Sequence, residues 1–251
     1  GAVRAAASSA AYELVLDVCE AYGRHYAAVL RRADAPAPAA LAGERSYGGG
    51  GGAVCRAAFK LEEALQARPE VLGALRREGA AVDIGASPGG WARVLAREAG
   101  AGGVVAAVDP GELEVCGGGE GGGGGRVAHV RMLYGGEGAE TAVDAALGGR
   151  RAGVVACDAN VHPEAAARLV ASACAAHCPA GGGAGPCFAV VSLKNFCKGF
   201  RGFKEASERA VAWLEGEGMA AEPGTCTVEH MVANGPQERT LTFRVRARGA
   251  D

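Results

Sequence analysis

From residue 80 onward, short apolar runs alternate with segments of helical periodicity, and this alternation constrains the fold more than any other feature. Strands are expected at 80–86, 103–110, 126–133, 152–159 and 187–194, and helices at 89–100, 138–147, 163–177 and 202–216. Parallel strands need a crossover between them, so the pattern predicts a doubly wound, mostly parallel α/β sheet. Residues 219–231 and 238–247 lack an intervening helix. They are expected to form a hairpin, which gives seven strands with an antiparallel last strand at the sheet edge.

The first 52 residues have a different character from the rest. Apolar residues recur at helical spacing over 8–32, which predicts one amphipathic helix. A Pro/Ala stretch at 34–40 and the run Gly48 to Gly52 are typical of a flexible linker. The expected organisation is therefore an N-terminal helix and linker (1–52) followed by the main domain (53–251). That domain opens with a helix over 54–77.

Composition excludes several classes of protein. With 49% hydrophobic and 22% charged residues, the chain is not wholly disordered. No apolar run approaches the ~20 residues that span a bilayer, so no membrane association is expected. A net charge of −2 excludes a globally basic nucleic-acid binder, although a local basic groove remains compatible with it.

The nine cysteines are scattered and contain no CxxC pair. This pattern favours structural thiols in a reducing intracellular compartment, without distinguishing cytoplasm, nucleus or organelle. Cys174 and Cys178 flank His177, but two Cys and one His make a poor zinc site, so no metal is expected. Because the chain begins with Gly1 and not Met, we expect a trimmed chain or fragment, and no targeting peptide is visible.

The segment VDIGASPGGW (82–91) lies where the first strand of the main domain ends and a helix begins, the place where open α/β sheets bind ligands. Gly85 permits a tight turn, and Gly89 and Gly90 permit close approach to the backbone. A dinucleotide fold would have GxGxxG here, whereas Pro88 removes an N–H that a pyrophosphate would use. Asp83 adds a negative charge. The turn therefore favours a nucleoside with a cationic tail, such as S-adenosylmethionine (SAM).

Asp-x-Gly-Ala-x-Pro-Gly-Gly-Trp, followed by Val-Asp-Pro-Gly after the second strand, resembles the FtsJ/RrmJ-type RNA ribose 2′-O-methyltransferases. The resemblance runs from about Cys55 to Arg248. It implies a Rossmann-like SAM methyltransferase fold, SAM as methyl donor and RNA as substrate. It also implies a set of cofactor-binding residues: Asp83, Gly85, Ser87, Pro88, Gly89, Gly90, Trp91, Asp109 and Asp158. Asp109 ends the second strand, where a carboxylate accepts hydrogen bonds from ribose hydroxyls.

The family has a Lys-Asp-Lys-Glu tetrad around the target ribose. Motif matches imply Lys60, Asp158, Lys194 and Glu238 as its members, with Lys194 the catalytic lysine. A 2′-hydroxyl is a weak nucleophile, and a lysine among carboxylates can accept or orient its proton. Three of the positions also have an ordinary explanation: Lys60 as a solvated lysine, Asp158 as a helix cap, and Glu229 as an acid competing with Glu238. Lys194 ends an apolar strand and is hard to explain as an ordinary surface residue.

One branch of the family matches further. CDANVHP (157–163) and SLKNFCKGFRGF (192–203) resemble the RlmM-type enzymes that methylate a cytidine ribose in bacterial 23S rRNA, which implies a role in rRNA processing. The family's usual adenine-binding Asp after the third strand is replaced by Arg131 to Tyr134, with Glu137 the nearest acid. This departure leaves adenine recognition to backbone groups, or lowers SAM affinity.

RNA contact is expected after the catalytic strand, where cations interleave with aromatic rings. The residues are Lys198, Arg201, Lys204 and Arg209 with Phe196, Phe200 and Phe203. The alternative is an ordinary basic helix start whose Phe side chains enter the core. Arg244, Arg246 and Arg248 alternate on the last strand and form a second candidate basic stripe.

The sequence thus favours a SAM-dependent RNA ribose 2′-O-methyltransferase. Two other classes stay open. One is a non-catalytic relative that binds SAM or RNA. The other is a different nucleotide enzyme, such as an mRNA cap ribose 2′-O-methyltransferase or a nicotinamide-dependent reductase, the latter disfavoured by Pro88.

Overall fold

The computed structural model describes residues 14–21, 24–31, 56–114, 124–179 and 185–247. The chain divides into two units, Gly1–Ala53 and Val54–Asp251. The expected linker lies outside the described residues, as does most of a Gly-rich segment at 116–125.

The first unit contains a β-hairpin where the sequence predicted a helix over 8–32, so that prediction was wrong. Strands β1 (Leu14–Ala21) and β2 (Arg24–Arg31) pair antiparallel, with Ala21 opposite Arg24. Helical and strand periodicities overlap here, because Leu14, Leu16 and Val18 also recur at every second position. Cross-strand pairs such as Leu16 with Val29, and a glycine at position 23 that costs about 1 kcal/mol inside a helix, favour strands.

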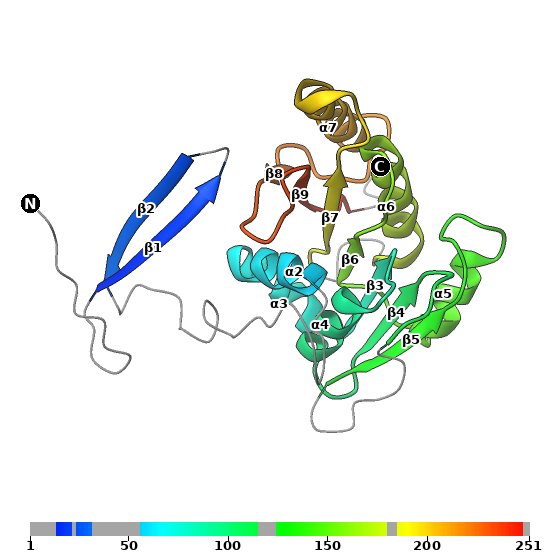
Figure 1. Ribbon diagram of the computed structural model, residues 1–251. Helices are drawn as coiled ribbons and strands as arrows, with labels where there is room; N and C mark the ends of the chain where they lie inside the picture. Colours follow the sequence, from blue (N-terminus) through cyan, green and yellow to red (C-terminus); the bar gives the residue numbers. More distant parts are fainter. Residues whose placement is uncertain (1–13, 22–23, 32–55, 115–123, 180–184, 248–251) are drawn as a thin grey trace, which may run out of the picture. The chain divides into compact units, whose positions relative to one another are not determined.

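The second unit contains the predicted seven-stranded sheet, in the order β5-β4-β3-β6-β7-β9-β8 (Figure 1). The parallel strands are β3 (Ala80–Ile84), β4 (Val104–Val108), β5 (Arg126–Val130), β6 (Val154–Cys157) and β7 (Phe188–Lys194). The last two strands are β8 (Thr227–Glu229) and β9 (Glu238–Arg244). The antiparallel strand is β9. We expected the antiparallel strand at the edge of the sheet. Instead, β9 lies inside the sheet, between β7 and β8.

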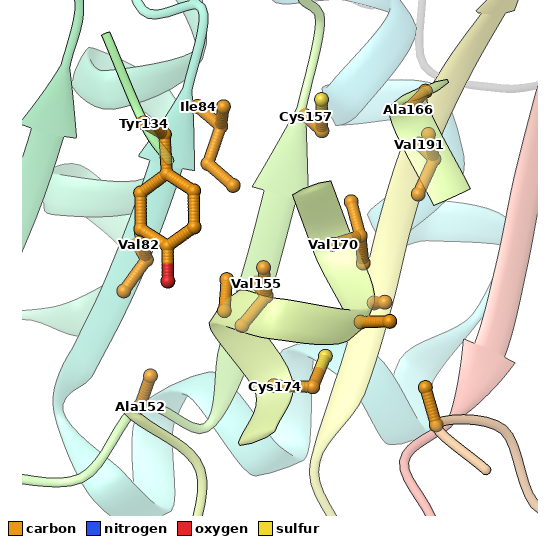
Figure 2. Close-up of a cluster of buried hydrophobic side chains, with 14 of the residues drawn as sticks. Val82, Ile84, Tyr134, Ala152, Val155, Cys157, Ala166, Val170, Cys174 and Val191 are labelled. Atoms are coloured by element: carbon orange, nitrogen blue, oxygen red, sulfur yellow. The ribbon is translucent and has the colours of Figure 1, made fainter. Parts of the chain in front are cut away.

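Helices cover both faces of this sheet, as a doubly wound fold requires. One face packs on α5 (Ala139–Leu147), α6 (Pro163–His177) and α7 (Gly199–Glu215). Figure 2 shows part of this core, with Val82, Val155 and Val191 of the sheet facing Val170 of α6. The other face packs on α2 (Arg56–Ala67), α3 (Pro69–Glu78) and α4 (Gly90–Ala99).

The single helix expected over 54–77 is two helices, α2 and α3. Pro69 begins α3, and Arg68 between the helices has an extended φ of −131° and ψ of 76°. A proline disfavours helical backbone in the residue before it, so α2 ends there. The break lets the two helices follow the sheet in different directions.

Gly85 directly follows β3 and sets the distance to the neighbouring strand. Its φ is +76°, and a Cβ at this position would lie 2.6 Å from Cα of Ala159, which follows β6. A side chain would therefore push apart the ends of β3 and β6. The glycine is required by the backbone beside it as well as by the turn.

We expect Gly85→Ala to destabilise the domain by about 3 kcal/mol or more, because it adds a steric clash to an unfavourable φ. Gly224→Ala is the matched control, since Gly224 has the same φ of +76° but no atom within 4 Å of the added Cβ. That control should cost about 1–2 kcal/mol. Urea unfolding followed by tryptophan fluorescence measures both. Equal losses would show that the contact with Ala159 is unimportant.

Candidate active site

Four side chains from distant parts of the sequence meet at the carboxyl edge of the sheet. Lys60 comes from α2, Asp158 directly follows β6, Lys194 ends β7 and Glu238 begins β9. Lys194 and Glu238 are paired residues in the antiparallel ladder of β7 and β9. The structure therefore brings together all four residues that the sequence proposed as a tetrad.

The four groups form one alternating network of charges. Lys60 Nζ lies 3.3 Å from Asp158 Oδ1 and 3.0 Å from the Glu238 carboxylate. Lys194 Nζ lies 3.1 Å from Asp158 Oδ1 and 3.9 Å from Glu238 Oε1. Their side chains are 9–19% exposed, so each charge depends on its partners for compensation. The ordinary explanations for Lys60 and Asp158, a solvated lysine and a lone cap, do not fit these contacts.

The contacts of Glu238 keep its carboxylate in the ionised form. Burial alone would raise its pKa, but the Gly235 N–H and the Lys60 ammonium outweigh burial and lower the pKa below its ordinary value. The Gly235 N–H donates to Oε2 at 2.8 Å. Its competitor Glu229 pairs instead with Arg68 at 2.9 Å on a more exposed surface. Glu238, and not Glu229, is thus the glutamate of the cluster.

Glu63 has a role that the sequence did not reveal. It lies one helical turn after Lys60 on α2, and its two carboxylate oxygens accept the N–H groups of Val232 and Ala233 at 2.8 and 2.9 Å. These residues belong to the loop that leads into Glu238. Helix α2 therefore carries Lys60 and also holds the loop that precedes Glu238, the ion-pair partner of Lys60. The motif FKLEE contains Glu63, but only the fold shows what the carboxylate contacts.

Trp91 is placed behind the glycine turn and not in it. Its side chain is buried among α2, α3 and α4, and Nε1 donates to the Ala57 carbonyl at 2.6 Å. This bond joins α4 to the helix that carries Lys60. The indole packs in the core and positions α2, and cofactor contact at Trp91 stays a prediction.

The other residues of the turn are joined by hydrogen bonds to the segment after β4. Gly89 has a φ of +119° and precedes α4, which begins at Gly90. Ser87 Oγ donates to the Glu112 carbonyl at 2.9 Å, and the Pro88 carbonyl accepts the Glu114 N–H at 2.9 Å. These bonds fasten the turn to the segment that follows β4.

Asp109 belongs to that same segment and directly follows β4. Its Oδ1 accepts the Gly111 N–H at 2.7 Å, and its carbonyl accepts a bond with His129 Nε2 at 2.9 Å. These contacts hold the carboxylate at the edge of the sheet beside the glycine turn.

Asp83 is the most unusual group of the site. It is completely buried, and neither carboxylate oxygen has a hydrogen-bond partner within the described residues. Burial raises its pKa well above the usual range, and the charges of Asp158 and Asp109 raise it further. The Ala92 N–H lowers the pKa somewhat without meeting the geometry of a hydrogen bond. A buried carboxylate without a partner suits a cationic ligand, as the ammonium of SAM would be.

After β5, an ion pair occupies the place of the adenine-binding Asp that the family usually has. Arg131 pairs with Glu112, which follows β4, and Leu133 is 70% exposed. Tyr134 turns inward and its hydroxyl contacts buried His177 at 3.1 Å. His177 also contacts Asp144 at 2.9 Å, so its ring is engaged away from any ligand set with Cys174 and Cys178.

The basic and aromatic segment divides between core and surface. Phe203 is buried, whereas Phe196 and Phe200 are 53% and 51% exposed. The alternative of rings that enter the core is therefore right for Phe203, whereas contact of Phe196 and Phe200 with RNA stays a prediction.

The second basic stripe is largely engaged within the domain. Arg244 pairs with Glu222, and Arg246 donates to the Glu215 carbonyl at 3.4 Å. Arg248 lies outside the described residues.

We expect Asp83→Asn to stabilise the protein without ligand and to weaken SAM binding. The folded protein holds the Asp83 proton more tightly than the unfolded chain does. The free energy of unfolding therefore falls as pH rises from the ordinary carboxyl pKa towards the raised one. The amide cannot ionise and avoids this loss, so the variant should be about 1–3 kcal/mol more stable at pH 8, with a smaller difference at pH 5. Urea unfolding at both pH values measures this effect.

Calorimetric titration with SAM is the companion measurement. Loss of the carboxylate charge should weaken SAM binding about tenfold or more, because hydrogen bonds to charged groups contribute about 1.5–3 kcal/mol. A variant that is less stable at pH 8 and binds SAM normally would contradict the role given to Asp83.

Neither a metal centre nor a membrane span emerges from the described residues. No group of three or more His, Cys, Asp or Glu among them could hold a metal ion. None of their helices combines the length and apolar character needed to cross a bilayer. Six cysteines of the second unit are free thiols: Cys157, Cys174, Cys178, Cys187, Cys197 and Cys226.

Comparison with solved structures supports the fold. The chain is similar to a Lactococcus lactis protein described as a candidate hemolysin, with TM-score 0.51 and 18% identity over 78% of this chain and 89% of that one. Cofactor-bound Rv0187 from MTB has TM-score 0.43 and 16% identity over 86% and 99% of the two chains. A T. thermophilus 16S rRNA methyltransferase in complex with AdoMet and guanosine has TM-score 0.34 and 15% identity over 94% and 52%. The last two similarities are too low to carry an argument.

Comparison of sequences supports SAM-dependent methyl transfer. No curated protein sequence matches the chain significantly. Residues 53–162 match the model of the FtsJ-like methyltransferase family, a region that includes the glycine turn, Lys60 and Asp158. This part of the chain is therefore similar to an FtsJ-like methyltransferase domain, and S-adenosylmethionine is the methyl donor.

Proposed function

We propose that this protein transfers a methyl group from SAM to a ribose 2′-hydroxyl of RNA. The observation that carries the proposal is the cluster of Lys60, Asp158, Lys194 and Glu238 at the sheet edge that also carries the unpartnered Asp83. Bound SAM supplies an electrophilic methyl group on a sulfonium. The cluster supplies what a weakly acidic hydroxyl needs, a proton acceptor and charges that orient it.

The distances support different roles for the two lysines. Lys60 lies within 3.3 Å of both carboxylates and balances their charge. Lys194 has one close partner, Asp158, and a second carboxylate at 3.9 Å. Because Lys194 has one close carboxylate where Lys60 has two, its amine is the less engaged of the two and is better placed to contact a substrate hydroxyl. Lys194 is therefore the proposed acceptor, and Lys60 the fixed cation.

The proposed transfer is a single in-line displacement. The ribose O2′ attacks the methyl carbon in line with the methyl–sulfur bond, which breaks as the O–CH₃ bond forms. Lys194 first gives a proton to solvent and is then a neutral amine. The hydroxyl proton passes to its Nζ, and the positive charge lost at sulfur appears on the ammonium that forms. Asp158, 3.1 Å away, stabilises the new charge. Glu238 and Lys60 hold the ribose beside it.

The proposed substrate is rRNA. The segments CDANVHP and SLKNFCKGFRGF, which resemble those of 23S rRNA cytidine 2′-O-methyltransferases, support this choice. The replacement of the adenine-binding acid by Arg131, paired with Glu112, favours the alternative of a non-catalytic relative that binds SAM or RNA. An mRNA cap methyltransferase has the same tetrad and is a further alternative.

We expect Lys194→Ala to lower kcat for methylation of unmodified rRNA by about 100-fold or more, the usual contribution of a general base. Lys194→Arg should fail equally, because an arginine keeps the charge but cannot accept a proton. SAM affinity should change less than about threefold, since neither substitution alters the glycine turn. Steady-state kinetics with labelled SAM and calorimetric titration measure the two effects.

Arg76→Ala is the control, because Arg76 lies on α3 with its side chain 60% exposed. An active Lys194→Arg variant would refute Lys194 as the proton acceptor. A wild-type protein that binds SAM and methylates no RNA would favour the non-catalytic alternative.

A further inference from the structure

The loop after β7 and the first turn of α7 present two aromatic rings to solvent. Phe196 is 53% exposed and Phe200 is 51% exposed, whereas Phe188, Phe203 and Phe243 are buried. A phenylalanine ring normally contributes to a core, so two half-exposed rings four residues apart call for a partner. Both follow Lys194 closely, and the Phe196 N–H donates to the Lys194 carbonyl at 3.1 Å.

The Phe200 ring is held in a defined position. It packs edge-to-face on the buried ring of Phe203, with centroids 6.3 Å apart at an angle of 71°. The guanidinium carbon of Arg239 lies 5.0 Å from the centroid of the Phe200 ring. A ring anchored from behind and covered by a cation provides a rigid surface for stacking.

The strand register places this ring near the tetrad in sequence pairing, but on the opposite face of the sheet. Lys194 pairs with Glu238, and the next pair is Leu193 with Arg239. Successive residues of a strand point to opposite faces, so Arg239 lies on the α7 face when Glu238 points towards α2. Arg239 Nη1 donates to the Glu238 carbonyl at 2.6 Å, which joins the two places.

The charges around the rings suit a polyanion. Lys198 precedes α7, Arg201 is 93% exposed in its first turn, and that turn contains no acidic residue. Arg201 also pairs with Glu205 at 3.2 Å, a surface contact that contributes little and is easily exchanged. Cations around an exposed ring match the phosphates and bases of an unpaired strand.

We propose that Phe200, with Phe196 beside it, stacks on an unpaired RNA base next to the target nucleotide, while the target ribose occupies the tetrad. The inference rests on the proposed function and defines its substrate as a single strand or loop. A base inside a duplex cannot stack on the ring, because its faces are covered by its neighbours. The flanking base is chosen over the target base because the ring and the tetrad lie on different faces of the sheet.

The test measures binding separately from catalysis. Fluorescence anisotropy at fixed salt would compare the wild-type chain of 251 residues with Phe200→Ala and Phe200→Trp on a single-stranded RNA of about 12 nucleotides. Phe200→Ala should weaken binding about tenfold, and Phe200→Trp should restore it, because stacking needs a ring of any kind. The same RNA in a duplex should bind more weakly to the wild type.

Met219→Ala is the matched control, since Met219 is another exposed apolar side chain, beyond the opposite end of α7. It should bind RNA as the wild type does. Unchanged binding by Phe200→Ala, failure of Phe200→Trp to restore it, or equal affinity for the duplex would overturn the stacking site.

The methylation assay separates the two proposals. RNA methylated at ribose with unaltered binding by Phe200→Ala would refute the stacking site alone. Ring-dependent RNA binding with no methylation of any RNA would refute the proposed function alone.

Discussion

The structure of this domain depends on burying two lysines and two acids together at the end of a sheet. Removing one partner from such a network leaves an uncompensated charge, which typically costs several kcal/mol. Lys60, Asp158, Lys194 and Glu238 come from a helix, a loop and two strands, and their side chains are at most 19% exposed. Charge balance therefore ties together elements that lie far apart in the sequence.

Neighbouring contacts give that cluster its geometry. Trp91 joins α4 to α2 through the Ala57 carbonyl, and Glu63 joins α2 to the loop before β9. Gly85 sets the spacing between the ends of β3 and β6. Asp83 remains without a hydrogen-bond partner among the described residues, a destabilising feature that a cationic ligand would relieve. A rigid frame around an unsatisfied carboxyl group is what a preorganised binding site needs.

Much of this could be predicted from sequence because strand ends and motifs are local. The alternation from residue 80 predicts the sheet, and parallel strands bring their carboxyl ends to one edge, so Asp158 and Lys194 were expected together. Patterns that fit two different structures could not be assigned from sequence. The apolar spacing over 8–32 suits helix and hairpin alike, and Phe196, Phe200 and Phe203 look equivalent until α7 is packed. The contacts of Glu63 and Trp91 depend on segments brought near only by the fold.

The most direct test of the central claim is to locate the methyl group. RNA labelled from radioactive SAM by the wild-type protein would be hydrolysed with alkali, which cannot cleave after a 2′-O-methylated ribose. The account predicts that the label appears in alkali-resistant dinucleotides. Label recovered in mononucleotides would place the methyl group on a base and would contradict the role given to the tetrad.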